Sequence, residues 1–241
     1  MITNPVKESP EAMSPFNVDV VLCMETSVLF CEKAREMVRF FYPALLAGMD
    51  DVGQPLGVLR VKMIAFGDYG ADTAAMVESP FCELPAEESR LLEFVNGVPF
   101  NDGSGPKNAL EAVALAMKSD WTTEGSKRRH MIAVVTHSEA LPLGARADCP
   151  NYPAGMPKDL KEMESLWECP DPQFVSTFDA RVGFLIAVAP PVYPWDYSEV
   201  GCWNRVILRE RVAGPVFLDC SIEEEIAFEI ASTLSLDRSS R

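Results

Sequence analysis

Apolar runs alternate with amphipathic stretches along most of the chain. Residues 18–24 are apolar at nearly every position, as in a strand that is covered on both faces. The same pattern predicts five further strands, at residues 58–66, 76–82, 131–136, 182–189 and 206–208. We expect residues 76–82 to form a short antiparallel strand at an edge of the sheet.

The longest amphipathic stretch follows the first strand. From Phe30 to Leu45, apolar residues recur every three or four positions and charged residues occupy the opposite side, which predicts a helix. Pro43 predicts a late kink or an early stop, because proline removes a backbone donor from the helix interior. The Gly- and Asp-rich residues 48–55 are expected to form the following turn.

Four more helices are expected along the chain. Two short ones lie at residues 85–95 and 158–167, and a third begins at Pro106, which suits the first helical position. The last helix begins at Ser221, which forms a capping box with Glu224 three residues later.

Strands that alternate with helices predict an α/β fold of the Rossmann-like, doubly wound kind. We expect a mostly parallel sheet of about six strands with helices on both faces. Residues 16–236 would form a single domain after a polar tail at residues 1–15. A Pro-rich, irregular insertion at about 138–177 interrupts it, and a connection of this length is usually functional or an elaboration of the fold.

The composition excludes some classes of partner. The formal net charge of −15, from 36 acidic and 21 basic side chains, argues against nucleic acid and anionic membranes, which favour Lys and Arg. No apolar run approaches the roughly 20 residues of a membrane span. The first residues lack the basic and apolar segments of a secretory signal. The oligomeric state stays open.

Seven cysteines are scattered along the chain without a C-x-x-C pair. This pattern is neither a disulfide framework nor a zinc site of standard spacing. We interpret them as reduced thiols, several of them in the core, and expect a cytoplasmic protein.

Polar residues follow two of the strands and precede one helix. Glu25, Thr26 and Ser27 come after the first strand, and His137 and Ser138 after the fourth. In a doubly wound sheet these positions meet at one edge, where the strand order reverses. Asp102, Gly103 and Ser104 precede a helix whose free N–H groups face the same edge.

These three stretches carry a resemblance to a known family. VVLCMETSVL, DGSG and IAVVTHSE have the order and spacing of the three loops of von Willebrand factor A domains. The resemblance covers about residues 16 to 236. Further features, among them FGDYG, NYPAGMP and PVYPW, look like a bacterial intracellular branch found near tellurite-resistance and phage-defence systems. The resemblance to von Willebrand factor A domains implies a protein-binding module whose rim holds a magnesium ion.

The residues that would hold the metal are altered in this chain. By the resemblance, Glu25 stands at the first Asp position, Ser27 at the first Ser, Ser104 at the Thr and His137 at the second Asp. Leu29 occupies the second Ser position and cannot coordinate a cation. Because magnesium prefers hard oxygens in octahedral geometry, we expect a degenerate site with weak or no binding of Mg²⁺ or another divalent cation.

Each of these residues also has a structural interpretation. Glu25 could be held by the free N–H groups of the following helix rather than by a metal. Ser27 and Ser104 could cap helices, and His137 could be hydrogen-bonded at a strand end rather than bind zinc. His130 begins its strand and is therefore expected at the opposite edge.

An aromatic segment follows the fifth strand. Tyr193, Trp195 and Tyr197 lie beside prolines and are candidates for a partner-binding rim, together with Thr26, Asp102, Gly103 and Ser138. Alternatively, the aromatic residues cover the insertion and pack with Trp167. We favour that second interpretation.

The sequence therefore predicts a protein-interaction module with a degenerate metal site and no catalytic residues. One alternative is a small-molecule or hydrolytic site in the same crevice, since serine, histidine and carboxylate side chains are present. Against it, neither a nucleophile elbow nor a P-loop is found. Another alternative is a scaffold that acts through the insertion at 138–177.

Overall fold

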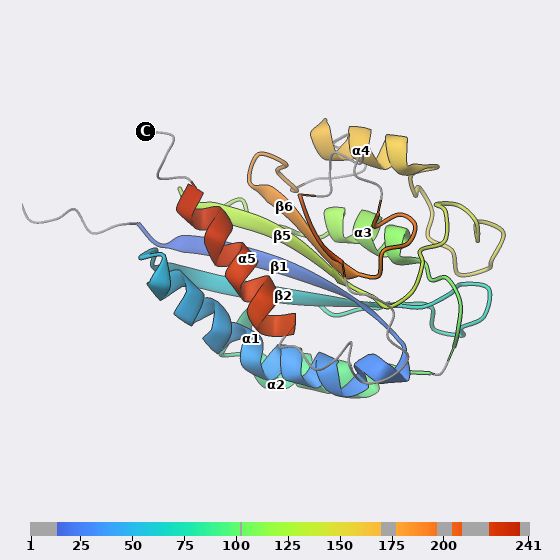
Figure 1. Cartoon of the computed structure of the whole chain (residues 1–241), viewed down its shortest axis with the longest axis horizontal. Helices are drawn as coiled ribbons and strands as arrows, with labels where there is room; N and C mark the ends of the chain where they lie inside the picture. The colour runs from blue at the N-terminus through green and yellow to red at the C-terminus, as the bar shows by residue number, and fades with distance from the viewer. Residues whose placement is uncertain (1–13, 102, 170–176, 197–203, 209–221, 237–241) are drawn as a thin grey trace, which may run out of the picture.

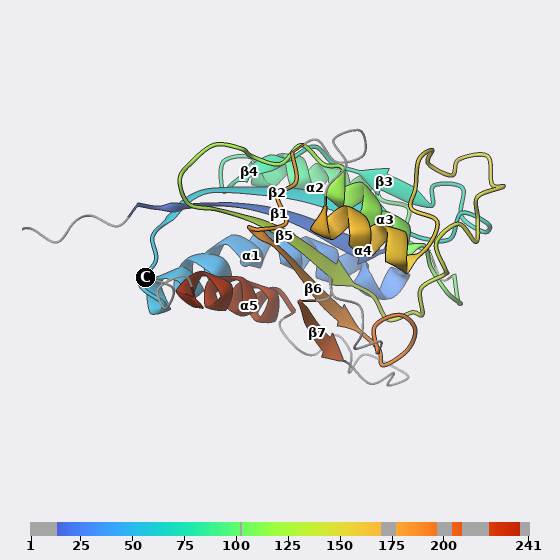
Figure 2. The same ribbon diagram turned by 90° about the horizontal axis from the view of Figure 1, so that it is seen from above.

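The computed structural model describes residues 14–101, 103–169, 177–196, 204–208 and 222–236. Within these ranges, seven strands form one mixed sheet in the order β3-β2-β1-β5-β6-β7, with β4 also paired to β2. Figure 1 shows the sheet viewed down the shortest axis of the molecule, and Figure 2 shows it from above after a turn of 90°. The strands are β1 (Phe16–Glu25), β2 (Leu56–Phe66), β3 (Met76–Glu78), β4 (Cys82–Leu84), β5 (Arg128–Val135), β6 (Gly183–Ala189) and β7 (Arg205–Leu208).

Five of these strands are parallel, as the alternation of strands and helices predicts. β1 lies in the centre and pairs with β2 on one side and β5 on the other, so that Val20 stands between Val61 and Met131. The segment expected as one strand at 76–82 is two short strands, both antiparallel to β2. Pro80 lies between them, and proline cannot donate to a strand ladder. The α/β, Rossmann-like fold class is thus confirmed.

Helices cover both faces of the sheet (Figure 1). One core packs against α1 (Cys31–Asp51), α2 (Glu88–Gly97) and α5 (Ile222–Leu236). The other core packs against α3 (Ala109–Met117) and α4 (Leu160–Glu168). Because both faces are covered, the central residues of β1 are buried throughout, which explains their continuous apolar run.

The prediction for the end of the first helix is wrong. α1 continues through Pro43 to Asp51, so the expected turn at 48–55 begins only at Val52. Packing against α5 explains this length, since a Cβ on Gly48 would stand 3.1 Å from the Cβ of Ala231. The small residue lets the two helices approach closely, and tertiary contact outweighs the local cost of proline.

Three other helix starts also differ from expectation, and one of them is α4, which begins at Leu160 rather than at residue 158. α3 begins at Ala109 with Asn108 as its N-cap residue, so Pro106 precedes the helix instead of opening it. α2 begins at Glu88 rather than at residue 85. Ser221 lies outside the described residues, as do the tail up to residue 13 and residues 170–176 of the insertion. None of the described helices is both long and apolar enough to cross a lipid bilayer.

Candidate functional site

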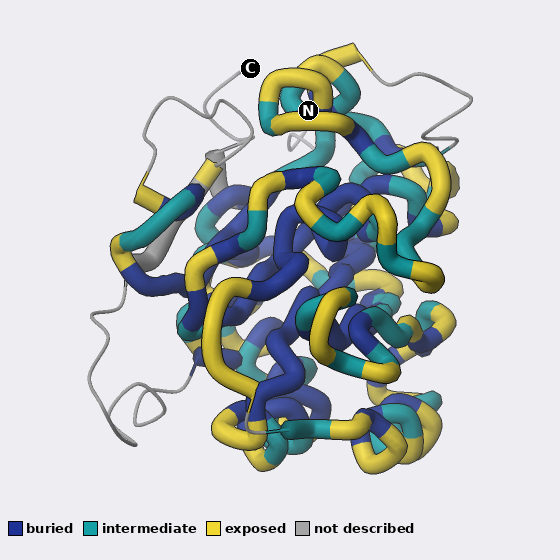
Figure 3. The backbone as a smooth tube through the Cα atoms, turned by 90° about the vertical axis from the view of Figure 1, so that its right-hand side faces the viewer, coloured by how far each residue is buried: buried dark blue, intermediate teal, exposed yellow. Residues whose placement is uncertain are grey.

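Backbone hydrogen bonds join three segments at the carboxyl edge of the parallel strands. Asn101 N donates to Thr26 O at 2.9 Å, and Val28 N donates to Asn101 O at 2.8 Å. Lys107 N donates to Glu139 O at 2.9 Å, and Leu141 N to Lys107 O at 2.7 Å. Asn101 is thus bonded to the loop that follows β1, and Lys107 to the loop that follows β5. We call residues 26–29, 101, 103–107 and 136–140 the rim, and Figure 3 looks onto this edge.

Glu25 ends β1 and points inward beneath the rim. Its side chain has no solvent exposure and lies in a cage of donors from the loop after β5. Oε2 accepts from Thr136 Oγ1 at 2.6 Å and from His137 N at 3.1 Å. Oε1 accepts from Ser138 Oγ at 3.0 Å and lies 3.0 Å from His137 Nδ1. Both oxygens of the carboxylate are therefore engaged within the protein.

This cage sets the charge state of the carboxyl group. Burial by itself raises the pKa of Glu25, but hydrogen bonds and charge from His137, with the Thr136 hydroxyl, lower the pKa below its usual value. The expectation that Glu25 is held by the N–H groups of the following helix is wrong. The donors come from the β5 loop because the parallel register places Glu25 beside the end of β5.

The hydroxyl groups of the two residues after Glu25 form hydrogen bonds with backbone atoms. Thr26 is buried, and its hydroxyl donates to Phe66 O at 3.2 Å. Ser27 caps the 3-10 turn Val28–Phe30, accepting a bond from Leu29 N at 3.4 Å. The turn presents Val28 and Leu29 to solvent, with 48% and 45% of their surface exposed. Of the two interpretations of Ser27, the structure shows the capping one.

The middle segment of the rim is open to solvent. Gly103 and Ser104 are exposed, and Gly103 N donates to Asn101 Oδ1 at 2.8 Å. Asp102 lies outside the described residues. Ser104 precedes the α3 N-cap residue, Asn108, by four positions, so it does not cap that helix.

The side chains that the structure describes at the rim do not offer the ligands of an octahedral magnesium site. Both Glu25 oxygens bind protein hydrogens, the Ser27 hydroxyl caps a turn, and Leu29 offers only hydrocarbon. Within the described ranges, no three His, Cys, Asp or Glu side chains are grouped so that they could hold a metal ion. Magnesium requires several hard oxygens at about 2.1 Å, which this arrangement does not provide.

The described part of the aromatic segment after β6 places Trp195 inside the protein. Trp195 is only 2% exposed and belongs to the same core cluster as Trp167, with Tyr193 packed against that cluster. The candidate role of Trp195 in a partner-binding rim is therefore wrong, and the favoured interpretation of mutual burial is confirmed for it. Tyr193 O accepts from Ala140 N at 3.0 Å, which ties this segment to the rim. Tyr197 lies outside the described residues.

Lys107 is a rim residue that sequence reasoning missed. It is 2% exposed and is among the largest fully buried side chains. A Cβ on Gly103 would stand 3.0 Å from its Nζ, so the ammonium lies directly beside that loop. A lysine two residues before a helix gives no signal of burial, because the burial results from backbone pairing with residues 139–141 far along the chain.

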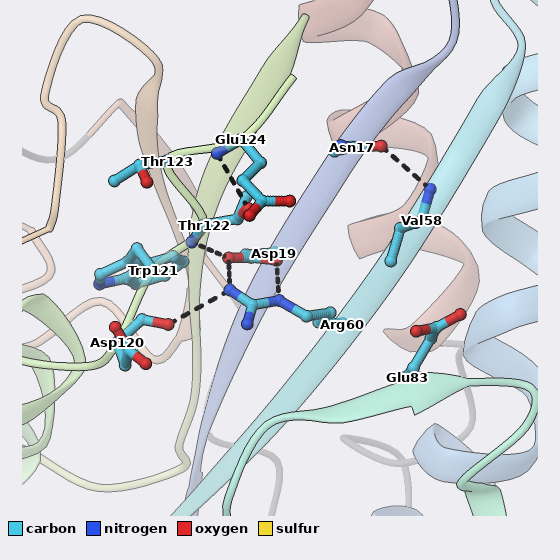
Figure 4. A pocket seen from close by; sticks show the side chains of 10 residues that line it. All are labelled: Asn17, Asp19, Val58, Arg60, Glu83, Asp120, Trp121, Thr122, Thr123 and Glu124. Carbon is cyan, nitrogen blue, oxygen red and sulfur yellow. Dashed lines mark hydrogen bonds and ion pairs between the residues drawn. The ribbon is translucent and has the colours of Figure 1, made fainter.

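A second polar site lies at the opposite edge of the sheet (Figure 4). Asp19, buried in β1, pairs with the Arg60 guanidinium from β2 and accepts from Thr122 N at 2.6 Å. These residues line a pocket of about 400 Å³ whose wall also holds Glu83, Asp120 and Glu124.

His130 lies at this opposite edge, as its position at the start of a strand predicts. Asp179 N donates to His130 Nδ1 at 3.2 Å, and Nε2 lies 2.9 Å from Thr122 O, so Nε2 carries the proton. The ring stacks on Trp121 at 5.0 Å between centroids. Burial lowers the pKa of His130, which favours the neutral form.

Comparisons with known proteins give little beyond this geometry. No family model matches the sequence, and no curated protein matches it. Among solved structures, the pilus adhesin SpaC from Lactobacillus rhamnosus GG aligns with 93% of this chain at 10% identity and a TM-score of 0.49. An open conformation of the same adhesin aligns with 93% at 10% identity and a TM-score of 0.44. The chain spans 31% and 30% of those two adhesin chains. Likeness at this level carries no information about binding or chemistry.

Proposed function

We propose that this chain is a protein-interaction module of the von Willebrand factor A type, which binds a partner through the rim with little or no dependence on metal. Three loops with the spacing of that family meet at one edge of a Rossmann-like sheet. Carboxyl edges of such sheets are where ligands are generally bound. As part of the proposal, the partner is intracellular, since the scattered cysteines are typical of a reducing compartment.

The exposure of Val28 and Leu29 carries this proposal. Both side chains are about half exposed, at 48% and 45%, on a turn that is held by the Ser27 cap and by Asn101 O. Leu29 replaces a residue that would coordinate metal in the family. Apolar side chains on a rigid turn lose little conformational entropy on binding and gain from being removed from water.

The inward-facing Glu25 is consistent with this role. In a metal-dependent rim a carboxylate must offer an oxygen to the metal ion, whereas the Glu25 oxygens accept bonds from the loop after β5. The cage therefore holds the loop after β5 in place beneath the rim. We assign Glu25 and His137 to positioning the rim and not to contacting the partner.

The hydrolytic alternative is less well supported by the same geometry. The Ser138 hydroxyl donates to Glu25, and the Ser27 hydroxyl accepts from Leu29 N. Each of these two serines is thus engaged in a structural bond rather than presented to a substrate.

Site-directed photocrosslinking tests the proposal in cells that naturally produce the protein. A photoreactive amino acid is placed at Leu29, or at Phe228 on α5, which is 66% exposed and serves as the control. We expect a specific crosslinked protein from position 29 and not from position 228. The captured protein is then purified, and its affinity should fall at least tenfold for Val28→Ser with Leu29→Ser. Capture from position 228 alone, or unchanged affinity in the double variant, would exclude the rim.

A further inference from the structure

Lys107 is a buried cation that forms no ion pair within 4 Å in the part of the chain that the structure describes, and its charge acts on Asp68 only from a greater distance. It is 2% exposed, and among the described residues its ammonium makes no hydrogen bond. Lys33, the other lysine that is buried among the described residues, pairs with Glu36 at 2.6 Å and with Glu223 at 3.9 Å. Buried lysines are almost always paired, so Lys107 is an exception that calls for an explanation.

The ammonium of Lys107 is positioned by its backbone. Bonds to Glu139 O and from Leu141 N hold the residue on both sides, directly before α3. On the solvent side stands Gly103, where a Cβ would approach Nζ to 3.0 Å and Asn101 Oδ1 to 2.7 Å. The absence of a side chain at Gly103 thus leaves the ammonium accessible from the rim.

Asp68 is the described carboxylate on which the charge of Lys107 acts, and it already forms an ion pair with another residue. Asp68 binds Arg146 through two bonds, of 2.6 and 2.9 Å. Arg146 is the main reason why the pKa of Asp68 lies below its usual range, and the charge of Lys107 contributes less. Asp68 therefore serves Arg146 and leaves the Lys107 ammonium available to an external carboxylate.

We propose that Lys107 is the specificity residue of the rim and binds the carboxylate of an Asp or Glu side chain on the partner, while Val28 and Leu29 contact an adjoining apolar side chain. This inference rests on the proposed function of the rim. Asn101 connects the two parts of the surface, because its carbonyl accepts from Val28 N and its side chain adjoins Gly103.

The physical basis is the cost of a lone charge in a poorly solvated position. A partner carboxylate supplies the missing counter-charge through a charge-assisted hydrogen bond, which is stronger than a neutral one. The net charge of −15 repels acidic partners at long range. The Lys107 ammonium acts only at short range. It therefore selects a partner whose carboxylate lies beside apolar atoms, rather than acidic proteins in general.

Acetate is a suitable probe because it carries the proposed group alone. We would titrate the full chain with sodium acetate, with sodium chloride at equal ionic strength as the reference, and follow the Lys107 side-chain and Gly103 amide signals by NMR. We expect saturable shifts at both positions with acetate only. Lys107→Met should abolish the Gly103 shift, whereas Lys161→Met, at an exposed lysine on α4, should retain it.

Thermal unfolding of the same variants gives a second readout. Removing an uncompensated buried charge should raise the unfolding temperature of Lys107→Met by about 2 to 4 °C. A lower unfolding temperature, together with no acetate-specific shift in the unsubstituted chain, would show that the ammonium is paired internally and would overturn the inference.

The crosslinked partner separates this inference from the proposed function. We expect Lys107→Met to weaken partner binding at least tenfold, and one Asp→Asn or Glu→Gln change in the partner to cause a similar loss that is not additive with it. Unchanged binding of Lys107→Met, with a loss in the Val28 and Leu29 variant, would overturn the role of Lys107 and leave the rim proposal standing. If neither variant affects binding, the proposed function itself fails.

Discussion

Glu25 Oε1 lies 3.0 Å from His137 Nδ1, and this pair joins the ends of β1 and β5 beneath the rim. The carboxylate is fully buried and also accepts bonds from the Thr136 and Ser138 hydroxyls. Its role is to hold one loop in place. The polar residues that follow the first apolar strand are thus turned into the protein rather than toward a ligand.

Glu25→Gln should destabilise the protein by about 2 to 4 kcal/mol, because an amide NH₂ would face hydroxyl and N–H donors that now bind a carboxylate oxygen. Urea unfolding at neutral pH measures this loss. The control is Glu32→Gln on α1, an exposed carboxylate that pairs only with Arg35 among the bonds described, and it should change stability by less than about 0.5 kcal/mol. Equal effects of the two variants would contradict the cage.

The same carboxylate predicts a pH dependence of stability. The pKa of Glu25 is lowered in the folded chain, so its contribution is fully present above the unfolded pKa of about 4.3 and is lost as the pH falls through the lower folded value. The sign follows because the unfolded chain binds the proton first. Stability of the wild type should therefore decline below about pH 4.3 more steeply than that of Glu25→Gln. Parallel pH profiles for the two proteins would contradict the assignment.

Ser27→Ala combined with Ser104→Ala should leave affinity for the crosslinked partner within about twofold, because in the proposed function neither hydroxyl holds a metal. Isothermal titration calorimetry in the presence of magnesium and then of a chelator measures this. The loss of the Ser27 cap should cost about 1 kcal/mol of stability without affecting affinity. A large loss of affinity that chelation of magnesium reproduces would restore the metal-dependent interpretation.

Gly48→Leu should destabilise the protein by about 1 to 3 kcal/mol, because the added side chain would separate α1 from α5. Even a Cβ at this position would approach Ala231 Cβ to 3.1 Å. The matched control is Gly97→Ala at the end of α2, where a Cβ meets no atom within 4 Å. That change should be neutral or stabilise by up to about 1 kcal/mol, as alanine favours helices. Denaturant unfolding of both variants measures the two changes in stability, and a Gly48→Leu variant as stable as Gly97→Ala would contradict the close packing of α1 against α5.

The apolar runs of the chain were sufficient to predict the main strands. The runs at 18–24, 58–66, 131–136, 182–189 and 206–208 each overlap a parallel strand of the structure, with ends that differ by at most three residues. Burial on both faces leaves a continuous apolar signature that needs no knowledge of the partner strand. The approach of the three loops also followed from the sequence, because parallel strands end at one edge.

Long-range contacts decided what local patterns could not. α1 passes through Pro43 because Gly48 packs against α5, which lies almost 180 residues later in the chain. Trp195 lies in the core rather than on the rim, since α3 and α4 provide an apolar cluster that receives it. Neither outcome is visible in the residues that surround these positions in the sequence.

The primary chain thus determined the class of fold and the edge where its polar loops meet. Both follow from features that recur in every parallel strand, namely an apolar run and an end at the same edge of the sheet. Only the tertiary structure decided that Glu25 faces inward, that Val28 and Leu29 face solvent and that Lys107 is buried. Each of these orientations depends on one register or one loop contact between segments that are distant in the chain. A single contact of this kind leaves no periodic pattern in the sequence.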